Sequence, residues 1–256
     1  MESVRINFLG HMVDDLSVEE TIAKIEEVIE TNSCIVREDL NASKLILMRG
    51  SKWLAEAFSQ ADLINVDGQS IIFASRFLGT PIRHKVSGID LMERLITCAH
   101  HRKYKIYLLG SRPAVVEALA SKLVVSHSVE LVAGFRHGYF DAIEETEVVA
   151  DIRNCQPDLV FIGMPSPQRE AFISKYKGAL SANFIMGVGG AFDVLSGRLS
   201  RAPLWMQRCG LEWLFRVYQE PFRLFFRYLK VIPIFSWVVL VEKIRRRRDE
   251  DHIPES

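Results

Sequence analysis

The chain has 256 residues, of which 48% are hydrophobic and 25% are charged, proportions that are ordinary for a soluble globular protein. Its 32 basic and 32 acidic residues cancel, so no net positive charge attracts it to nucleic acid, and we expect no nucleic-acid partner. The four cysteines lie far apart, without the spacing of a zinc site or of a secreted disulfide framework. This length suits one α/β domain with a small appendage.

Short apolar runs alternate with helical periodicities along the first part of the chain. Ser17 and Glu20 predict a capping box at the start of the first helix. Glycine and proline mark the turns that follow. We expect strands at residues 4–9, 34–36, 63–66 and 105–109, and helices at 17–29, 42–49, 53–61, 70–78 and 89–100.

The same alternation continues to about residue 190, and the composition then changes. We expect further strands at 129–133, 158–162 and 183–186, and helices at 113–124, 142–154 and up to about 176. Strands that alternate with helices predict an α/β fold, with a Rossmann-like, largely parallel sheet covered by helices on both faces. We therefore expect an α/β domain over residues 1–197 and a helical, basic appendage over 198–256.

Asp67 follows an apolar strand and precedes Gly68 and a new helical period. In open α/β sheets, ligands bind at the carboxyl ends of the strands. A carboxylate buried there can have a raised pKa and act as a general base on a hydroxyl group. The alternative is a turn in which the Asp67 side chain caps the next helix.

Two glycine loops each connect a strand to a helix, and both are candidates for binding a diphosphate. They are Gly110-Ser111-Arg112-Pro113 and Gly187-Val188-Gly189-Gly190. Helix amino termini attract phosphate, and glycine allows the backbone to approach it closely. Neither loop fits a P-loop or a full dinucleotide fingerprint, so ordinary tight turns are the alternative.

Two isolated polar residues could assist. Asn41 lies between a strand and a helix, where it could donate to a substrate oxygen or cap the helix. Lys85 lies in a basic loop, where it could neutralise charge that develops on a phosphate, or be solvated. The histidines and the terminal acidic run form no metal pattern, so we expect no metal site.

The appendage is basic and aromatic. Arg216, Arg223 and Arg227 would share a face of one continuous helix, but Pro221 is expected to break that helix. Such a segment suits an anionic membrane surface or a diphosphate, and the alternative is a packed helix with a solvated basic face. The apolar run at residues 231–241 is too short to cross a bilayer unaided.

In chain order, these pieces resemble the WecG/TagA/CpsF family of bacterial glycosyltransferases over about residues 38 to 228. No single piece is specific, but six or more in the same order are. The resemblance rests on Leu40-Asn41-Ala42, Val66-Asp67-Gly68, Val86-Ser87-Gly88-Ile89-Asp90-Leu91, Leu108-Leu109-Gly110, His137-Gly138-Tyr139-Phe140, Gly163-Met164-Pro165-Ser166-Pro167, the run from Gly187 to Asp193, Gly197-Arg198, Arg201-Ala202-Pro203 and the run from Gly210 to Arg216.

The resemblance implies a metal-independent, inverting sugar transfer that needs no cofactor. The donor would be a nucleotide-diphosphate sugar, usually a UDP sugar, and the acceptor a polyprenyl-diphosphate-linked sugar. The protein would be peripheral, at the cytoplasmic face of the bacterial plasma membrane and attached through its appendage, and it could form a homo-oligomer. Its products would feed cell-surface polysaccharides.

The family's proposed base falls on Asp67, its asparagine on Asn41, and its appendage arginines among Arg216, Arg223 and Arg227. With Lys85, the first two form our candidate catalytic group. The other candidate substrate-binding residues are Gly110, Ser111, Gln168, Arg169, Gly187, Gly189, Gly190 and Asp193.

This chain departs from the family pattern at three positions. Asp39 stands where the family often has threonine, and Lys85 where it often has arginine. Arg169 takes the place of a glutamine, with Gln168 beside it, so either residue could reach the donor sugar. These changes leave a rival hypothesis open, in which the chain is a non-catalytic nucleotide-binding or membrane-scaffolding protein on the same fold.

Overall fold

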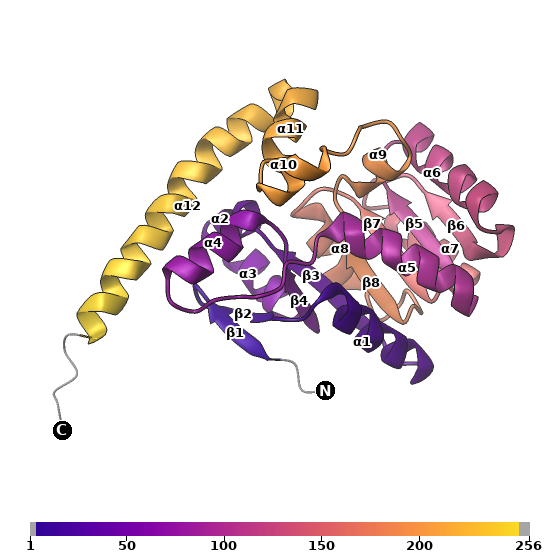
Figure 1. The fold of residues 1–256 in the computed structure, drawn as a ribbon. Helices are drawn as coiled ribbons and strands as arrows, with labels where there is room; N and C mark the ends of the chain where they lie inside the picture. Colours follow the sequence, from indigo (N-terminus) through magenta and orange to yellow (C-terminus); the bar gives the residue numbers. More distant parts are fainter. Residues whose placement is uncertain (1–3, 251–256) are drawn as a thin grey trace.

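A computed structural model describes residues 4–250, apart from the side chains of Arg223 and Glu250. At its centre lies a six-stranded sheet in the order β4-β3-β8-β7-β5-β6 (Figure 1). All neighbouring strands are parallel, so their carboxyl ends meet at one edge, and the predicted α/β architecture is confirmed. The strands are β3 (Ile35–Leu40), β4 (Leu63–Val66), β5 (Ile106–Gly110), β6 (Val132–Arg136), β7 (Leu159–Gly163) and β8 (Phe184–Gly187).

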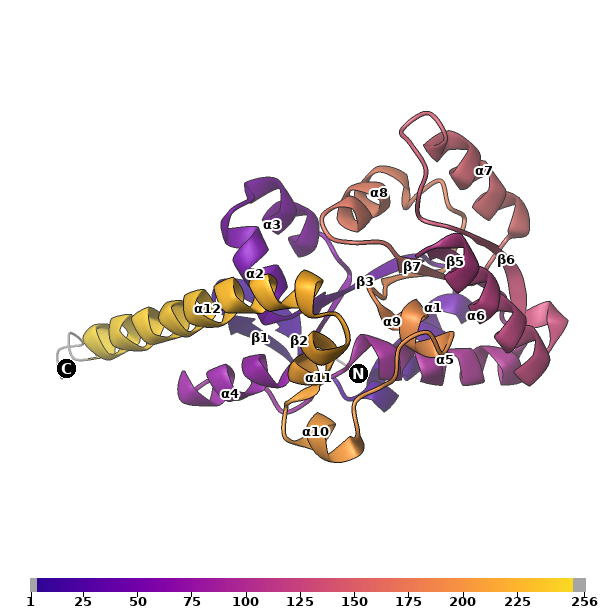
Figure 2. The ribbon, with the colours of Figure 1, turned by 90° about the horizontal axis from the view of Figure 1, so that it is seen from above.

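Helices cover both faces of this sheet because its side chains alternate between two apolar clusters. Ile106 and Leu108 of β5 pack in a cluster with α1, α5, α6 and α9, whereas Tyr107 and Leu109 pack with α7 and α8. Figure 2 shows the two helical layers on opposite sides of the strands. These helices are α1 (Val18–Glu30), α5 (Gly88–Arg102), α6 (Pro113–Ser126), α7 (Glu145–Cys155), α8 (Gln168–Tyr176) and α9 (Ala191–Leu195).

A third apolar cluster surrounds the β3–β4 edge of the sheet and contains α2 (Ala42–Arg49), α3 (Lys52–Ser59) and α4 (Gln69–Phe77). The predicted boundaries of α2 are reproduced, and the predicted capping box of α1 is confirmed, since Ser17 and Glu20 bond each other's backbone. Most other predicted elements agree within three residues.

The predicted first strand is half of a hairpin that the sequence did not indicate. Strands β1 (Arg5–Phe8) and β2 (His11–Asp14) pair antiparallel around Leu9 and Gly10, which have φ angles of 50° and 88°. Two positive φ angles are the mark of a tight hairpin turn, usually formed by Asn-Gly or Gly-Gly. Leucine rarely adopts a positive φ angle, so Leu9 in the first position gave no sign of this turn in the sequence. Asp14 fastens the hairpin to the sheet edge by accepting a 2.8 Å bond from Ile64 N–H.

The strand predicted at residues 129–133 begins and ends three residues later in the structure. Val129–Leu131 forms a 3-10 turn, and β6 begins only at Val132. The strand continues through Gly134, which periodicity treats as a break. A Cβ at Gly134 would lie 2.7 Å from the Tyr107 ring, so the absent side chain leaves room for that ring within the pair β5–β6.

The appendage contains α10 (Leu204–Arg208), α11 (Glu212–Gln219) and α12 (Pro221–Glu250). The predicted break at Pro221 is confirmed, but α12 continues through Pro233. Phe235, Val238 and Val239 pack α12 onto the third cluster. The run 231–241 alone is short. Judged by length and composition alone, the segment Leu224–Asp249 is long and apolar enough to cross a membrane; its most apolar stretch has a mean hydropathy of 1.8 and is 28% buried.

Candidate functional site

A large cavity of about 2020 Å³ opens at the carboxyl edge of the sheet, between the strand ends and the appendage. It brings together most of the residues that the sequence analysis singled out, from positions 39 to 240. The candidate residues that line it are Asn41, Asp67, Lys85, Ser111, Gln168, Arg169, Gly187, Gly189, Gly190, Asp193, Arg216 and Arg227. Gly110 is not among the lining residues, and the Arg223 side chain lies outside the described part of the structure.

Asp67 lies immediately after β4 and does not cap the helix that follows it. The N-cap of α4 is Gly68, and no side chain caps this helix. Asp67 Oδ2 instead accepts a 3.4 Å bond from Gly88 N–H at the start of α5. Burial raises the pKa of Asp67 to about 6, with a further rise from Asp39, and Arg37 and Arg216 oppose both. A carboxylate with this pKa is ionised at neutral pH and still basic enough to accept a proton from a hydroxyl group.

A network of buried charges lies beneath the cavity, and two of its members, Asp39 and Arg37, act on the pKa of Asp67 in opposite directions. Three cations face three carboxylates there, so the network is balanced without the charge of Asp67. Its members are Arg37, Lys44, Arg169, Glu38, Asp39 and Glu170, all at most 9% exposed. The sequence analysis identified neither Arg37 nor Lys44, although three charged residues inside the short strand β3 were a signal of buried polar function.

Arg37 is a fully buried member of this network. Its guanidinium donates to Asn65 Oδ1 at 3.1 Å and to the Val86 carbonyl at 3.0 Å. Its Nη1 lies 3.9 Å from Asp39 Oδ1 and has no hydrogen-bond partner among the described atoms. Arg37 therefore supplies fixed positive charge to both Asp39 and Asp67.

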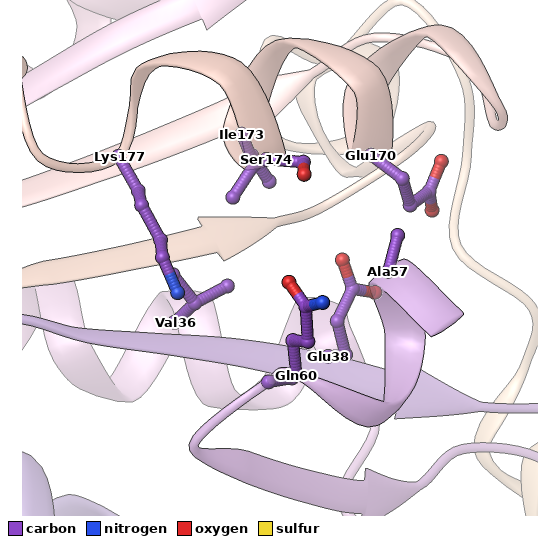
Figure 3. A pocket seen from close by; sticks show the side chains of 9 residues that line it. Val36, Glu38, Ala57, Gln60, Glu170, Ile173, Ser174 and Lys177 are labelled. Carbon is purple, nitrogen blue, oxygen red and sulfur yellow. The ribbon is translucent and has the colours of Figure 1, made fainter. Parts of the chain in front are cut away.

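Lys44 and Arg169 balance the other side. Lys44 Nζ bonds Glu38 and lies 3.3 Å from Glu170 and 3.8 Å from Asp39. Behind Glu38 and Glu170, between α3 and α8, is a second cavity of about 20 Å³ (Figure 3). It has room for a single water molecule and not for a nucleotide.

Asn41 acts as the N-cap of α2, the alternative that the sequence analysis left open. Its Oδ1 accepts from Lys44 N–H at 2.9 Å, and its Nδ2 donates to Asp39 Oδ2 at 2.7 Å. The amide keeps a second hydrogen that no partner in the described structure takes up. Asn41 can therefore orient Asp39 and still donate one bond into the cavity.

The glycine of the first loop, Gly110, allows two backbone segments to pack closely. A Cβ at Gly110 would lie 2.5 Å from the Gly163 backbone, and Ser111 N–H donates to the Gly163 carbonyl at 3.0 Å. The expectation that Gly110 approaches the diphosphate directly therefore has no support in the geometry. Ser111 still lines the cavity, as does its neighbour Arg112, which the sequence analysis did not select.

The second loop is shaped by Arg169. A Cβ at Gly187 would lie 2.3 Å from Arg169 Nε, because the arginine side chain crosses the backbone at that point. Arg169 Nη2 then donates to Glu170 Oε1 at 2.7 Å. Gln168, by contrast, is exposed at the cavity wall without a partner in the described structure. Of the two alternatives, Gln168 is therefore the one free to contact a ligand.

The appendage adds cations opposite the strand ends. Arg216 of α11 and Arg227 of α12 line the cavity from separate helices, together with Lys85 from the loop before α5. Arg227 also lies 5.1 Å from the centre of the Tyr228 ring. Asp193 is paired with Arg198, which leaves its carboxylate neutralised. Within residues 4–250, no cluster of histidine, cysteine and acidic side chains has the composition of a metal site.

Comparison with known proteins identifies the family of this chain. Residues 6–249 match the profile of the glycosyl transferase WecG/TagA/CpsF family. An N-acetylglucosaminyldiphosphoundecaprenol N-acetyl-β-D-mannosaminyltransferase of Bacillus subtilis is 30% identical over 75% of this chain and 73% of its own. A protein of the same name from Staphylococcus aureus is 34% identical over 73% of this chain and 72% of its own. The chain belongs to the WecG/TagA/CpsF family and is a glycosyltransferase.

Proposed function

We propose that this enzyme transfers a sugar, with inversion, from a UDP-sugar to a hydroxyl group of a polyprenyl-diphosphate-linked sugar. The observation that carries the proposal is Asp67, a carboxylate with a raised pKa at a strand end, facing a cavity that is also lined by Lys85, Arg216 and Arg227. The names of the two relatives specify an N-acetylhexosamine as the transferred sugar and a lipid diphosphate in the acceptor.

Asp67 would remove the proton from the acceptor hydroxyl as its oxygen attacks the anomeric carbon. The bond between that carbon and the UDP oxygen breaks at the same time, so one displacement inverts the configuration. Lys85, Arg216 and Arg227 would offset the charge that the departing diphosphate gains. Protonated Asp67 would then lose its proton to solvent, since it keeps some exposure to the cavity.

Gln168 and Asn41 complete the proposed donor site. Gln168 has free donor and acceptor groups at the cavity wall, and Asn41 has one free amide hydrogen. Asp39 stands beside Asn41 as an ionised carboxylate, since Lys44, Arg169 and Arg37 outweigh its burial and hold its pKa below the usual range. A pocket that contains this acid would favour a sugar with hydrogen-bond donors at that position.

The test is UDP release by the purified full-length protein with a panel of UDP-sugars and a lipid-linked N-acetylglucosamine acceptor, with chelator present. We expect release with one donor and no loss caused by chelator. Asp67→Asn should reduce turnover by at least about a hundredfold while UDP still binds. Binding of UDP without release on any acceptor would contradict the proposal, and unchanged turnover in Asp67→Asn would refute the role of the base.

We further propose that residues 198–256 attach the enzyme to the cytoplasmic face of the membrane. Support comes from exposed aromatic side chains on α12, such as Phe222 and Trp237, and from the basic cluster at its end. The full chain should sediment with anionic vesicles, and less with neutral vesicles or at high salt. Equal recovery in the supernatant with and without anionic vesicles would refute this attachment.

A further inference from the structure

We propose that the groove between α4 and α12 holds the first part of the acceptor's prenyl chain, an inference that rests on the function proposed above. Phe73 and Phe77 form its α4 wall, and Ile232 and Leu240 form its α12 wall. All four belong to the lining of the same cavity that contains Asp67. We call these residues the α4–α12 groove.

The two helices that form the groove are held together at its far end. Lys243 Nζ of α12 lies 5.8 Å from the centre of the Phe77 ring, and Arg246 Nη1 donates to the Leu78 carbonyl at 3.2 Å. Phe235 and Val239 of α12 are buried in the same apolar cluster as Ile71 of α4. Figures 1 and 2 both show α12 passing beside α4 on its way to the carboxyl terminus.

Both walls of the groove are apolar where a surface helix normally presents polar residues. The opposite face of α4 already packs in the core, yet Phe73 is 56% exposed and Phe77 is 53% exposed. Ile232 and Leu240 are each about 45% exposed. Exposed apolar side chains that line the same cavity as a candidate base are typical of a ligand-binding groove.

The polarity of the cavity changes along α12 in the order that an amphiphilic lipid requires. Arg227 lies at the polar end, and the apolar wall continues as far as Leu240. At the rise of an α-helix, this separation is about 20 Å. A diphosphate at Arg227 would thus direct an attached hydrocarbon chain along Ile232 and Leu240. The nucleotide donor has polar groups at both ends and cannot fill this arm.

The occupant is therefore the acceptor, whose diphosphate joins a sugar to an apolar chain. A bilayer could also cover these side chains, but in that case they would not increase the affinity of the enzyme for an acceptor that is free in water. The length of the acceptor's chain thus distinguishes the two occupants. We expect the enzyme to bind a soluble acceptor more tightly when its diphosphate bears a prenyl chain.

The experiment compares two water-soluble acceptors with the same sugar diphosphate, one bearing a farnesyl chain and the other a methyl group. Rates are measured with the full-length enzyme, without vesicles or detergent. The wild-type KM should be at least about tenfold lower for the farnesyl acceptor. Phe73→Ser and Phe77→Ser should raise that KM by about tenfold, and change the methyl-acceptor KM and the UDP-sugar KM by less than about twofold.

Trp237→Ser is the matched control, because Trp237 is 65% exposed on α12 but does not line the cavity. It should leave both acceptor KM values unchanged. An equal effect of the α4 variants on both acceptors, or no preference of the wild type for farnesyl, would overturn the groove assignment. Transfer by the wild type to neither acceptor would instead contradict the proposed function itself.

Discussion

Asp67→Asn should make the protein more stable at neutral pH, although it removes the proposed base. The pKa of Asp67 is about 6 in the folded protein, about 2 above the ordinary aspartate value of 3.8 that applies in the unfolded chain. At about 1.4 kcal/mol for each unit, ionised Asp67 lowers the free energy of unfolding by up to about 3 kcal/mol. The partial exposure of the carboxylate reduces this, so we expect a gain of about 2 kcal/mol.

The sign of the pH dependence follows from the direction of the pKa shift. Between pH 4 and 6 the folded protein binds a proton that the unfolded chain has lost, so stability falls as pH rises through this window. Asparagine carries no charge and removes that fall. The gain of Asp67→Asn should therefore be complete above about pH 6 and vanish below about pH 4.

Urea unfolding of wild type and Asp67→Asn at pH 7.5 and pH 4 measures this difference. Asp15→Asn is a control of opposite sign. Burial acts to raise the pKa of Asp15, but bonds from the Arg83 side chain and the backbone of His84 and Arg83 hold it below its usual value. Asp15→Asn should therefore destabilise at pH 7.5. If Asp67→Asn gave no gain at pH 7.5, or the same gain at pH 4, our explanation of the site's electrostatics would be wrong.

Three further substitutions test the network around Asp67. Asp39→Asn should move the acidic limb of the kcat/KM profile to lower pH by about one unit, because Asp67 loses a neighbouring negative charge; initial rates from pH 4.5 to 8 would show it. Lys44→Met should lower the free energy of unfolding by about 3–5 kcal/mol, since it removes the cation that bonds Glu38 and leaves three buried carboxylates with two cations; an unchanged urea midpoint would contradict this. Gly187→Ala should destabilise by about 1–3 kcal/mol, because its Cβ would displace Arg169, and thermal melting measures the loss.

The parts of the fold that could be predicted from sequence depend on residues close together in the chain. The capping box needs only Ser17 and Glu20, and the position of Asp67 at a strand end needs only the preceding apolar run. The missed features depend on unusual or distant partners. Leu9 adopts a left-handed conformation that side-chain type does not suggest, and the partners of Arg37 lie 28 and 49 residues away.

The same distinction explains why the sequence indicated the candidate residues but not which of them contact a ligand and which pack beneath the cavity. Sequence placed Gln168 and Arg169 next to each other at a helix start and could not choose between them. The choice depends on Gly187, whose missing side chain gives Arg169 its path to the buried carboxylates. Arg169 is committed to the buried network, so of the two residues only Gln168 is exposed at the cavity wall. The different environments of these two neighbours in α8 thus depend on Gly187 at the end of β8.

The appendage acts on Asp67 through the same kind of distant contact. Among the charges that act on Asp67, Arg37 and Asp39 are fixed in β3, whereas Arg216 belongs to α11. Arg216 lowers the pKa of Asp67, and it also faces the cavity where the leaving diphosphate would lie. The position of α11 therefore affects both the ionisation of the base and the charge available to the leaving group. If α11 moved away from the strand ends, the pKa of Asp67 would rise and the leaving diphosphate would lose the charge of Arg216. We therefore expect turnover to depend on the packing of α11 and α12 on the sheet domain.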